Sequence, residues 1–265
     1  MYERITSHTN PKVKNLIKLG KGRGKDRKEN FIFEGLKEIE LALAAGIEIV
    51  SVYFCPEIVD ADVLETIGTQ VDPRKIFSIS TEIYSRIAYR DSTGGFLVLA
   101  KTQYQKLHDI KLSKNPLVLI LESVEKPGNL GGILRTSDAA NIDLVIICDP
   151  LTDLFNPNII RSSLGCIFTV PTIACTTEEA QLWLKENNIK SYASDLATDH
   201  WYHELDYTGP SALIMGTEAT GLSENWLNVA DHRIKIPMQG KIDSLNVSTA
   251  TAILVFEAMR QRKFH

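Results

Sequence analysis

Short apolar runs alternate along the chain with stretches in which apolar residues recur at helical spacing. The run at 31–35, FIFEG, predicts a strand, and the stretch at 36–46, LKEIELALAAG, predicts an amphipathic helix that stops at Gly46. The alternation continues with strands predicted at 47–55, 75–79 and 95–100 and with helices at 60–68 and 81–89. This order predicts a small α/β domain in which helices pack on a largely parallel sheet.

A second alternating series begins after a polar stretch that ends at Pro116. Its first run, LVLILES at 117–123, is almost continuously apolar, which is typical of a strand buried on both faces. Further strands are predicted at 144–148, 170–174, 190–194, 211–215 and 233–236, and a long amphipathic helix at 246–262. The sequence therefore predicts an N-terminal domain over 1–103, a linker over 104–116 and a second α/β domain over 117–265.

Composition narrows the class of protein. The hydrophobic content is 44%, as in globular domains, and the sequence has neither a secretory leader pattern nor an apolar stretch long enough to span a membrane. We therefore expect a cytoplasmic protein. The four cysteines are scattered without C-x-x-C spacing, and the pair His200 and His203 has no third ligand nearby, so we expect neither a disulfide nor a metal site.

Charge is distributed unevenly along the chain. Residues 1–30 hold nine Lys or Arg against three Asp or Glu, a net charge of +6, so the other 235 residues carry −10. Most of the basic residues lie in or just after a helix predicted at 9–20, with Thr9 or Asn10 as its cap, Pro11 in its first turn and Gly20 after its end. A basic arm on an acidic body predicts a local contact with a polyanion, although a solvated helix without a partner has the same pattern.

Three segments of the second domain, each following a predicted strand, are rich in small and polar residues. The first loop is ESVEKPGNLGGILRTSD at 122–138, the second is LIMGTEATGLSENW at 213–226, and the third is IKIPMQGKIDSLNVSTATA at 234–252. Parallel α/β sheets bind ligands where such loops converge, at the carboxyl ends of the strands. In the second loop we expect Ser223 to cap a helix that contains Trp226.

The first loop is rich in glycine, like a phosphate-binding turn, but it matches neither of the two common phosphate-binding sequence motifs. Gly128, Gly131 and Gly132 follow the order G-x-x-G-G without a subsequent Lys, unlike the dinucleotide loop or the P-loop. We interpret this segment as a strand, a glycine turn and a helix that carries Asn129 and Arg135.

The three loops resemble, in order and spacing, the three motifs of the SpoU/TrmH family of RNA ribose 2′-O-methyltransferases, in the SPOUT superfamily. The matching residues are, in the first motif, Asn129, Gly132, Arg135 and Thr136; in the second, Gly216, Glu218, Gly221 and Ser223; and in the third, Ile236, Pro237, Met238, Gly240, Ser244, Leu245, Asn246, Val247 and Ser248. The resemblance covers residues 116–263, and the N-terminal part resembles more loosely the family's substrate-binding domain.

This resemblance implies a parallel-sheet methyltransferase domain with a deep trefoil knot, S-adenosylmethionine (SAM) as the cofactor, and a homodimer packed through the knotted region. By analogy, the backbone around Gly216, Ile236, Met238 and Leu245 would hold the cofactor. The implied substrate is structured RNA, ribosomal in preference to transfer RNA, since RNA has the 2′-hydroxyl and a basic arm could follow phosphates.

The resemblance also implies catalytic residues, namely Arg135, Asn129, Glu218, Ser244 and Asn246. A ribose hydroxyl must attack a sulfonium methyl in line and must lose its proton. Arginine is a poor base, so two roles stay open for Arg135: a base with a depressed pKa, or a fork that binds an RNA phosphate and stabilises the alkoxide. Asn129, Ser244 and Asn246 would orient Arg135 or the ribose, and Glu218 would hold the second loop or pair with a cation.

Other hypotheses differ in the class of function. The chain could be a transfer RNA 2′-O-methyltransferase, a base methyltransferase on the same scaffold, or a non-catalytic RNA-binding protein that assists ribosome assembly. The motif residues favour ribose methylation, but the sequence names neither the RNA nor the nucleotide, and it does not separate a housekeeping role from antibiotic resistance.

Overall fold

The computed structural model describes residues 2–21, 27–88 and 94–264, and these residues form two compact units. One unit contains Met1–Gln103 together with Asp153–Thr169, and the other contains Tyr104–Thr152 and Val170–His265. The segment 153–169 therefore packs with the N-terminal unit, although in sequence it lies between strands of the C-terminal unit.

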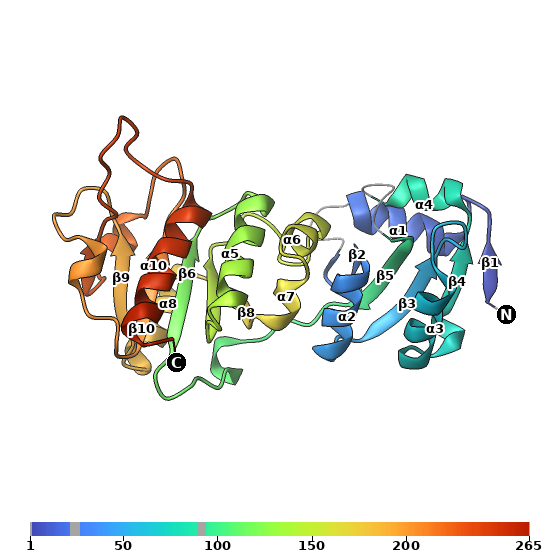
Figure 1. Ribbon diagram of the computed structural model, residues 1–265, viewed down its shortest axis with the longest axis horizontal. Coiled ribbons are helices and arrows are strands. Elements are labelled where there is room, and N and C mark those ends of the chain that lie inside the picture. Colours follow the sequence, from blue (N-terminus) through green and yellow to red (C-terminus); the bar gives the residue numbers. More distant parts are fainter. Residues whose placement is uncertain (1, 22–26, 89–93, 265) are drawn as a thin grey trace. The chain divides into compact units, whose positions relative to one another are not determined.

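The N-terminal unit is built on a mixed five-stranded sheet (Figure 1). Its elements are β1 (Glu3–Ile5), α1 (Pro11–Lys21), β2 (Asn30–Glu34), α2 (Leu36–Ala44), β3 (Ile49–Phe54), α3 (Ala61–Gln70), η2 (Pro73–Lys75), β4 (Ile76–Ile79), α4 (Thr81–Ile87) and β5 (Phe96–Lys101). The sheet order is β1-β4-β3-β5-β2. β5 runs antiparallel to both of its neighbours, so the prediction of a largely parallel sheet was wrong for this unit.

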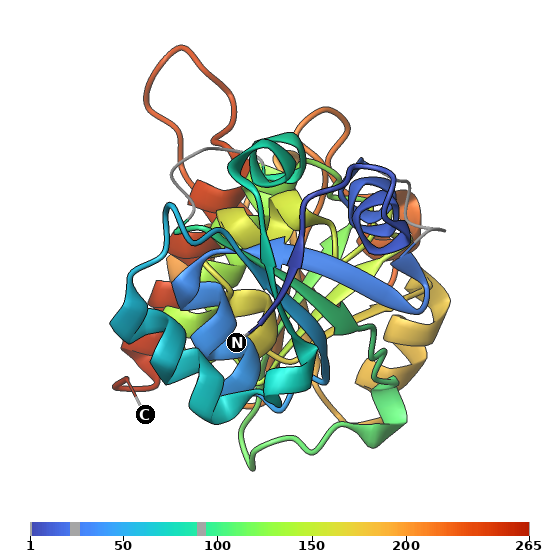
Figure 2. The same ribbon diagram turned by 90° about the vertical axis from the view of Figure 1, so that its right-hand side faces the viewer.

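Helices cover both faces of this sheet. α1 and α4 pack on one face, where Val13, Leu16 and Tyr84 join a buried apolar cluster with residues of the strands (Figure 2). Asn10 Oδ1 accepts a hydrogen bond from the Lys12 backbone at the start of α1, as expected of a cap, but α1 includes Gly20 instead of ending before it. The Gly20 side of the helix faces Ile32 of β2 closely, which suits a residue without a side chain.

The segment 153–169 is held to the N-terminal unit by aromatic and ionic contacts. It contains α6 (Pro157–Ser162) and α7 (Cys166–Thr169). Phe155 stacks on Phe31 of β2 with ring centroids 4.4 Å apart. The side chains of Arg27 and Asp153, 5% and 7% exposed, form an ion pair with 2.7 Å between Nε and Oδ2. Because a buried charge without its partner is costly, this pair fixes the segment to the unit.

The C-terminal unit contains a six-stranded sheet in which every pairing between named strands is parallel. Its elements are η3 (Leu107–Asp109), β6 (Leu117–Glu122), α5 (Pro127–Ala139), β7 (Leu144–Cys148), β8 (Thr172–Cys175), α8 (Thr177–Glu186), β9 (Lys190–Ser194), η4 (Tyr202–Glu204), β10 (Ser211–Met215), α9 (Glu224–Leu227), β11 (His232–Ile234) and α10 (Val247–Gln261). The order is β11-β9-β10-β6-β7-β8. The predicted strands are all present, with shifts of up to two residues at the ends of β8 and β11.

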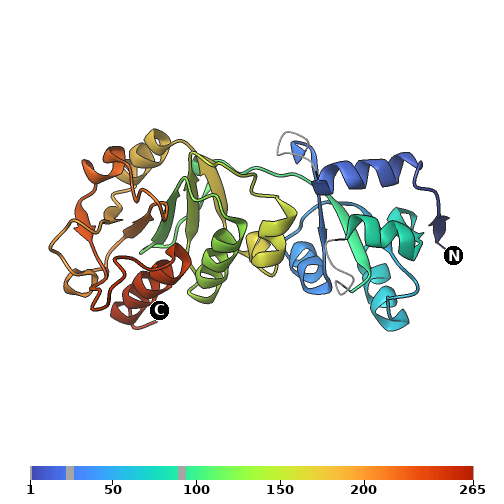
Figure 3. The ribbon, with the colours of Figure 1, turned by 90° about the horizontal axis from the view of Figure 1, so that it is seen from above.

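Two pairs of helices sandwich this sheet. α8 and α9 bury Trp183 and Trp226 against one face, and α5 and α10 lie side by side on the other (Figures 1 and 3). The central strands β6 and β10 are buried along their whole lengths, as their apolar sequences predict. Since these neighbours are parallel, the loops that follow them leave the same edge of the sheet.

Candidate active site

The three loops meet at the carboxyl edge of the C-terminal sheet. Met215 at the end of β10 is paired in register with Leu121 near the end of β6, so the first and second loops start side by side. The third loop leaves β11 after Ile234 and returns to start α10 at Val247. The fold thus brings together segments that are more than a hundred residues apart, as expected for ligand sites in parallel α/β sheets.

The second loop folds back on the end of its own strand. The backbone groups of Thr217 and Gly221 exchange two hydrogen bonds of 3.1 Å, and Gly221 has a φ of 68°. A Cβ atom on Gly216 would lie 2.2 Å from the carbonyl carbon of Gly221. Gly216 is therefore required by close backbone packing, and Gly221 by its left-handed conformation.

A buried carboxylate anchors the end of this loop. Glu122, the last residue of β6, accepts hydrogen bonds from the Ser223 backbone at 2.7 Å and from the Ser223 hydroxyl at 2.6 Å. Ser223 does precede α9, and Trp226 lies inside that helix, but the Ser223 side chain does not cap the helix as predicted. It binds Glu122 instead, which joins the second loop to the strand before the first loop.

The glycines of the first loop are helical and do not form a turn. α5 begins at Pro127, so Gly128, Asn129 and Gly132 all lie in its first two turns, which corrects the predicted glycine turn. A Cβ atom on Gly132 would lie 3.2 Å from Cβ of Ser248. The glycine at this position therefore lets α5 and α10 approach closely.

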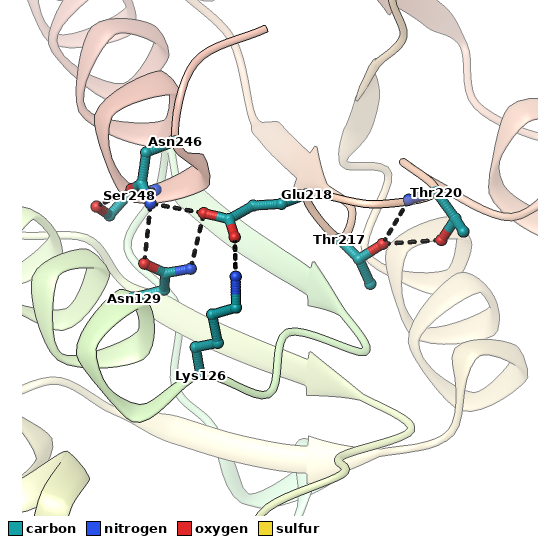
Figure 4. A network of polar contacts seen from close by, with 7 residues as sticks. All are labelled: Lys126, Asn129, Thr217, Glu218, Thr220, Asn246 and Ser248. Carbon is teal, nitrogen blue, oxygen red and sulfur yellow. Dashed lines mark hydrogen bonds and ion pairs between the residues drawn. The ribbon is translucent and has the colours of Figure 1, made fainter.

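A cluster of polar side chains joins all three loops, and we call Lys126, Asn129, Glu218 and Asn246 the Glu218 cluster (Figure 4). Glu218 Oε2 accepts from Lys126 Nζ at 2.5 Å. Glu218 Oε1 accepts from Nδ2 of Asn129 at 3.0 Å and from Nδ2 of Asn246 at 2.6 Å. Asn246 also donates to Asn129 Oδ1 at 3.1 Å, and its own Oδ1 accepts from Ser248 as the cap of α10. One carboxylate thus fixes two amides from different loops.

The charge state of the cluster follows from its contacts. The hydrogen bond from Lys126, and then that from Asn129, lower the pKa of the Glu218 carboxyl. Glu218 in turn raises the pKa of the Lys126 ammonium group. Glu218 is therefore an anion at neutral pH and acts only as an acceptor, while Lys126 stays a cation.

A cavity of about 400 Å³ lies beside this cluster, between the second and third loops. All four residues predicted to bind the cofactor line it, as do two of the predicted catalytic residues: Gly216, Ile236, Met238, Leu245, Glu218 and Ser244. Its volume is in the range of small-molecule sites. Asn129 and Asn246 are not among its lining residues, but both donate hydrogen bonds to Glu218, which is.

Two predicted catalytic residues stay outside the cluster. Arg135 is exposed on α5, and the structure records no hydrogen bond or ion pair for it within the described part of the chain. Ser244 is exposed in the third loop, and its hydroxyl donates to Asp243 at 3.3 Å. The guanidinium of Arg135 therefore has its donors available.

Lys126 and Glu122 were missed at the sequence level. Lys126 lies in the first loop and Glu122 ends the strand before it, but neither has a recognisable function until its partner is known, and those partners are 92 and 101 residues away. The sequence contained a weak signal for Lys126. Glu218 was expected to pair with a cation, and Lys126, directly before Pro127, is a cation in another of the three loops.

Comparison with known proteins identifies the family. Residues 116–256 match the model of the SpoU rRNA Methylase family, and residues 10–98 match the MRM3-like substrate binding domain. The chain belongs to the SpoU rRNA methylase family. A crystal structure described as an RNA 2′-O ribose methyltransferase is 34% identical, with a TM-score of 0.84 over 98% of this chain and 99% of that one.

Further relatives of the family are similar to this chain. The AdoMet-bound rRNA methyltransferase from Sinorhizobium meliloti is 30% identical, with a TM-score of 0.89 over 98% of both chains. The 23S rRNA (guanosine(2553)-2′-O)-methyltransferase of Bacillus subtilis is 29% identical over 96% of this chain and 98% of its own. The tRNA (guanosine(18)-2′-O)-methyltransferase of Thermus thermophilus is 38% identical, but over only 60% of this chain and 82% of its own.

Among the residues that the structure describes, no helix is long and apolar enough to cross a membrane. Nor do three or more His, Cys, Asp or Glu side chains gather there in a way that could hold a metal ion.

Proposed function

We propose that this protein transfers a methyl group from SAM to the 2′-hydroxyl of a ribose in structured RNA. The observation that carries the proposal is the position of Glu218. Its side chain lines the cavity and at the same time ties together Asn129 and Asn246, so the family's motif residues form one polar surface beside a space of ligand size.

The volume of the cavity and several of its lining residues support SAM as the ligand. Apolar lining residues, which include Met215, Leu222 and Leu254, suit an adenine ring, and Gly216 lines the cavity without a side chain of its own. Asp243 lines the same cavity, as does Asp195, which is paired with Arg233, and a carboxylate such as that of Asp243 suits a ligand with a sulfonium and an ammonium group. We propose that the backbone at Gly216, Ile236, Met238 and Leu245 holds the cofactor.

The bound cofactor would supply an electrophilic methyl group, and the side chains would position and activate the ribose. We propose that Arg135 binds the hydroxyl or the adjacent phosphate, since its guanidinium donors are not engaged by any described residue. Asn129 and Asn246, fixed by Glu218, would present oriented amides to the ribose, and Ser244 would add a hydroxyl from the third loop.

We propose ribosomal RNA as the substrate in preference to transfer RNA. The Bacillus relative that acts on 23S rRNA aligns over nearly the whole chain, whereas the transfer RNA enzyme aligns over little more than half. The N-terminal unit, matched to a substrate-binding domain, presents exposed lysines on α1, which contains no acidic residue. In this proposal residues 1–103 bind RNA, 104–116 link the domains and 117–265 transfer the methyl group.

We also propose a cytoplasmic homodimer whose interface includes α5 and α10, with the third loop forming a trefoil knot. The side-by-side packing of these helices and the 42% exposure of Phe256 on α10 support an apolar contact there. Sedimentation equilibrium tests the oligomeric state, and a monomer at micromolar concentration would contradict it.

Methyl transfer by the purified protein tests the function. The protein is incubated with radiolabelled SAM and either protein-free ribosomal RNA or total transfer RNA, and the product is digested to nucleosides. We expect label in a 2′-O-methyl nucleoside from ribosomal RNA. Label in a base would support the base methyltransferase hypothesis, and binding of RNA without any transfer would support the non-catalytic one.

A further inference from the structure

The Glu218 cluster contains one residue to which neither the motifs nor the proposed roles assign a task. Lys126 precedes Pro127 at the start of α5, and its ammonium group is the cation that contacts Glu218. The Lys126 side chain is 66% exposed, so it has no packing role that would explain it, whereas Glu218 is 27% exposed.

We propose that Lys126 is a positioning residue for methyl transfer, which acts by holding the Glu218 carboxylate where it can orient Asn129 and Asn246. This inference rests on the proposed function. Lys126 occupies Glu218 Oε2, and this leaves Oε1 to accept from both amides. If the carboxylate turned, Oε1 would no longer meet both amides, and if Oε2 took up a proton, the ionic contact with Lys126 that holds the carboxyl in place would be lost.

The amide orientation depends on this arrangement. Glu218 accepts from Nδ2 of both Asn129 and Asn246, and the Asn246 amide also donates to Asn129 Oδ1. These contacts decide which end of each amide faces away from the cluster. A side chain that fixes Glu218 therefore also fixes the polar surface beside the cavity, although it need not touch the substrate.

Several groups act on the Glu218 carboxyl. The hydrogen bonds from Lys126 and Asn129 lower its pKa most, partial burial raises it, and the charge of Lys126 and the backbone of Val247 on α10 lower it further. Of these partners only Lys126 carries a charge. The pKa of Lys126 is raised mainly by Glu218 and also by the nearby charge of Glu125. Lys126 and its neighbours lower the pKa of Glu218, so the carboxylate persists as the pH falls until that lowered pKa is reached. Replacement of Lys126 by an uncharged residue should raise the pKa of Glu218, so that its carboxylate takes up a proton at a higher pH.

Three variants separate a positioning role from a structural one. Lys126→Met keeps most of the side-chain length but loses the charge, Lys126→Arg keeps the charge, and Lys185→Met on α8 controls for the loss of one exposed cation. Single-turnover rates at saturating RNA and SAM are measured across pH, with the melting temperature as a check of folding. We expect Lys126→Met to lose roughly 10- to 100-fold in rate at neutral pH, as a misplaced group costs.

The shape of the pH profile is the decisive readout. We expect the acidic limb of the Lys126→Met profile to lie at higher pH than that of the wild type, Lys126→Arg to restore both rate and limb, and Lys185→Met to change neither. An unmoved limb with an unchanged saturated rate overturns the inference. If, in addition, RNA binding weakens and its salt slope falls by roughly 0.7–0.9, Lys126 contacts a phosphate instead. A wild-type protein without methyl transfer would refute the proposed function itself, which is a different result.

Discussion

Arg135 is the residue on which the proposed chemistry depends most, and it stands apart from the Glu218 cluster. We predict that Arg135→Ala abolishes methyl transfer, with a loss of at least about 100-fold, while the affinity for SAM stays within about twofold, because the cavity is lined by other residues. Single-turnover kinetics and calorimetry measure the two quantities. Near-normal turnover by a folded variant would exclude both proposed roles.

Arg135→Lys then distinguishes the roles. Lysine keeps the positive charge but lacks the planar fork, so it should rescue little if a bidentate contact to the phosphate or alkoxide matters. A lysine that served as a base would instead recover activity as the pH rises, because it must lose its proton to act. The pH dependence of the variant's rate therefore decides between them.

Gly216 offers a steric test of the cofactor cavity. Gly216→Ala would force a Cβ atom against the backbone at Gly221, so the second loop must shift. We predict at least a tenfold weaker affinity for SAM and a loss of about 1–3 kcal/mol in the free energy of unfolding. Gly209→Ala is the matched control, since nothing lies within 4 Å of its Cβ position. Equal behaviour of the two variants would mean that the loop conformation is not required.

At the scale of elements, Asn246 has two tasks that can be separated. Its Oδ1 caps α10, and its Nδ2 donates to Glu218. Asp is as good a cap as Asn but has no donor and repels Glu218. We predict that Asn246→Asp retains the stability of the protein but loses activity, whereas Asn246→Ala loses activity and about 1 kcal/mol of stability. Thermal melts and transfer rates check this, and an active Asn246→Asp protein would contradict a role for the donor.

The elements themselves could largely be predicted from sequence, because each depends on local periodicity. β9 and β10 have the predicted bounds, and the apolar run of β10 is flanked by the turn residues Pro210 and Gly216. The prediction of a largely parallel sheet in the N-terminal unit was wrong because strand direction depends on pairing. β5 pairs antiparallel with two strands that are far from it in sequence. The prediction of a glycine turn in the first loop was wrong because glycine favours turns locally. In the folded protein Gly132 lies inside α5, where the lack of a side chain allows α10 to pack closely.

Only those residues of the candidate site that belong to the three motifs could be predicted from the sequence. The four predicted cofactor residues line one cavity, and Asn129, Glu218 and Asn246 contact one another. The roles of Lys126 and Glu122 depend on partners that the fold alone brings near. Long-range pairs of this kind have no periodic signature in a single sequence.

At the scale of the whole molecule, the segment 153–169 makes the division of the chain discontinuous. A fragment that starts at Tyr104 would keep this segment but lose Arg27 and the rings that pack on Phe155 and Phe168. Exposure of each of these phenylalanine rings should lower the free energy of unfolding by roughly 1.5–3 kcal/mol. We predict that residues 104–265 alone associate beyond the proposed dimer and melt at a lower temperature than the full chain. The same fragment with Phe155→Ser and Phe168→Ser should be more soluble, and a monodisperse unmodified fragment would contradict this.

The proposed 2′-O-methylation of RNA is tested most directly by a mass map of ribose methylation in RNA from cells with and without the gene. We expect that one 2′-O-methyl site in ribosomal RNA is lost without the gene, returns with the wild-type protein and does not return with Arg135→Ala. Unchanged ribose methylation in both ribosomal and transfer RNA, or the loss of a base methyl group instead, would contradict it.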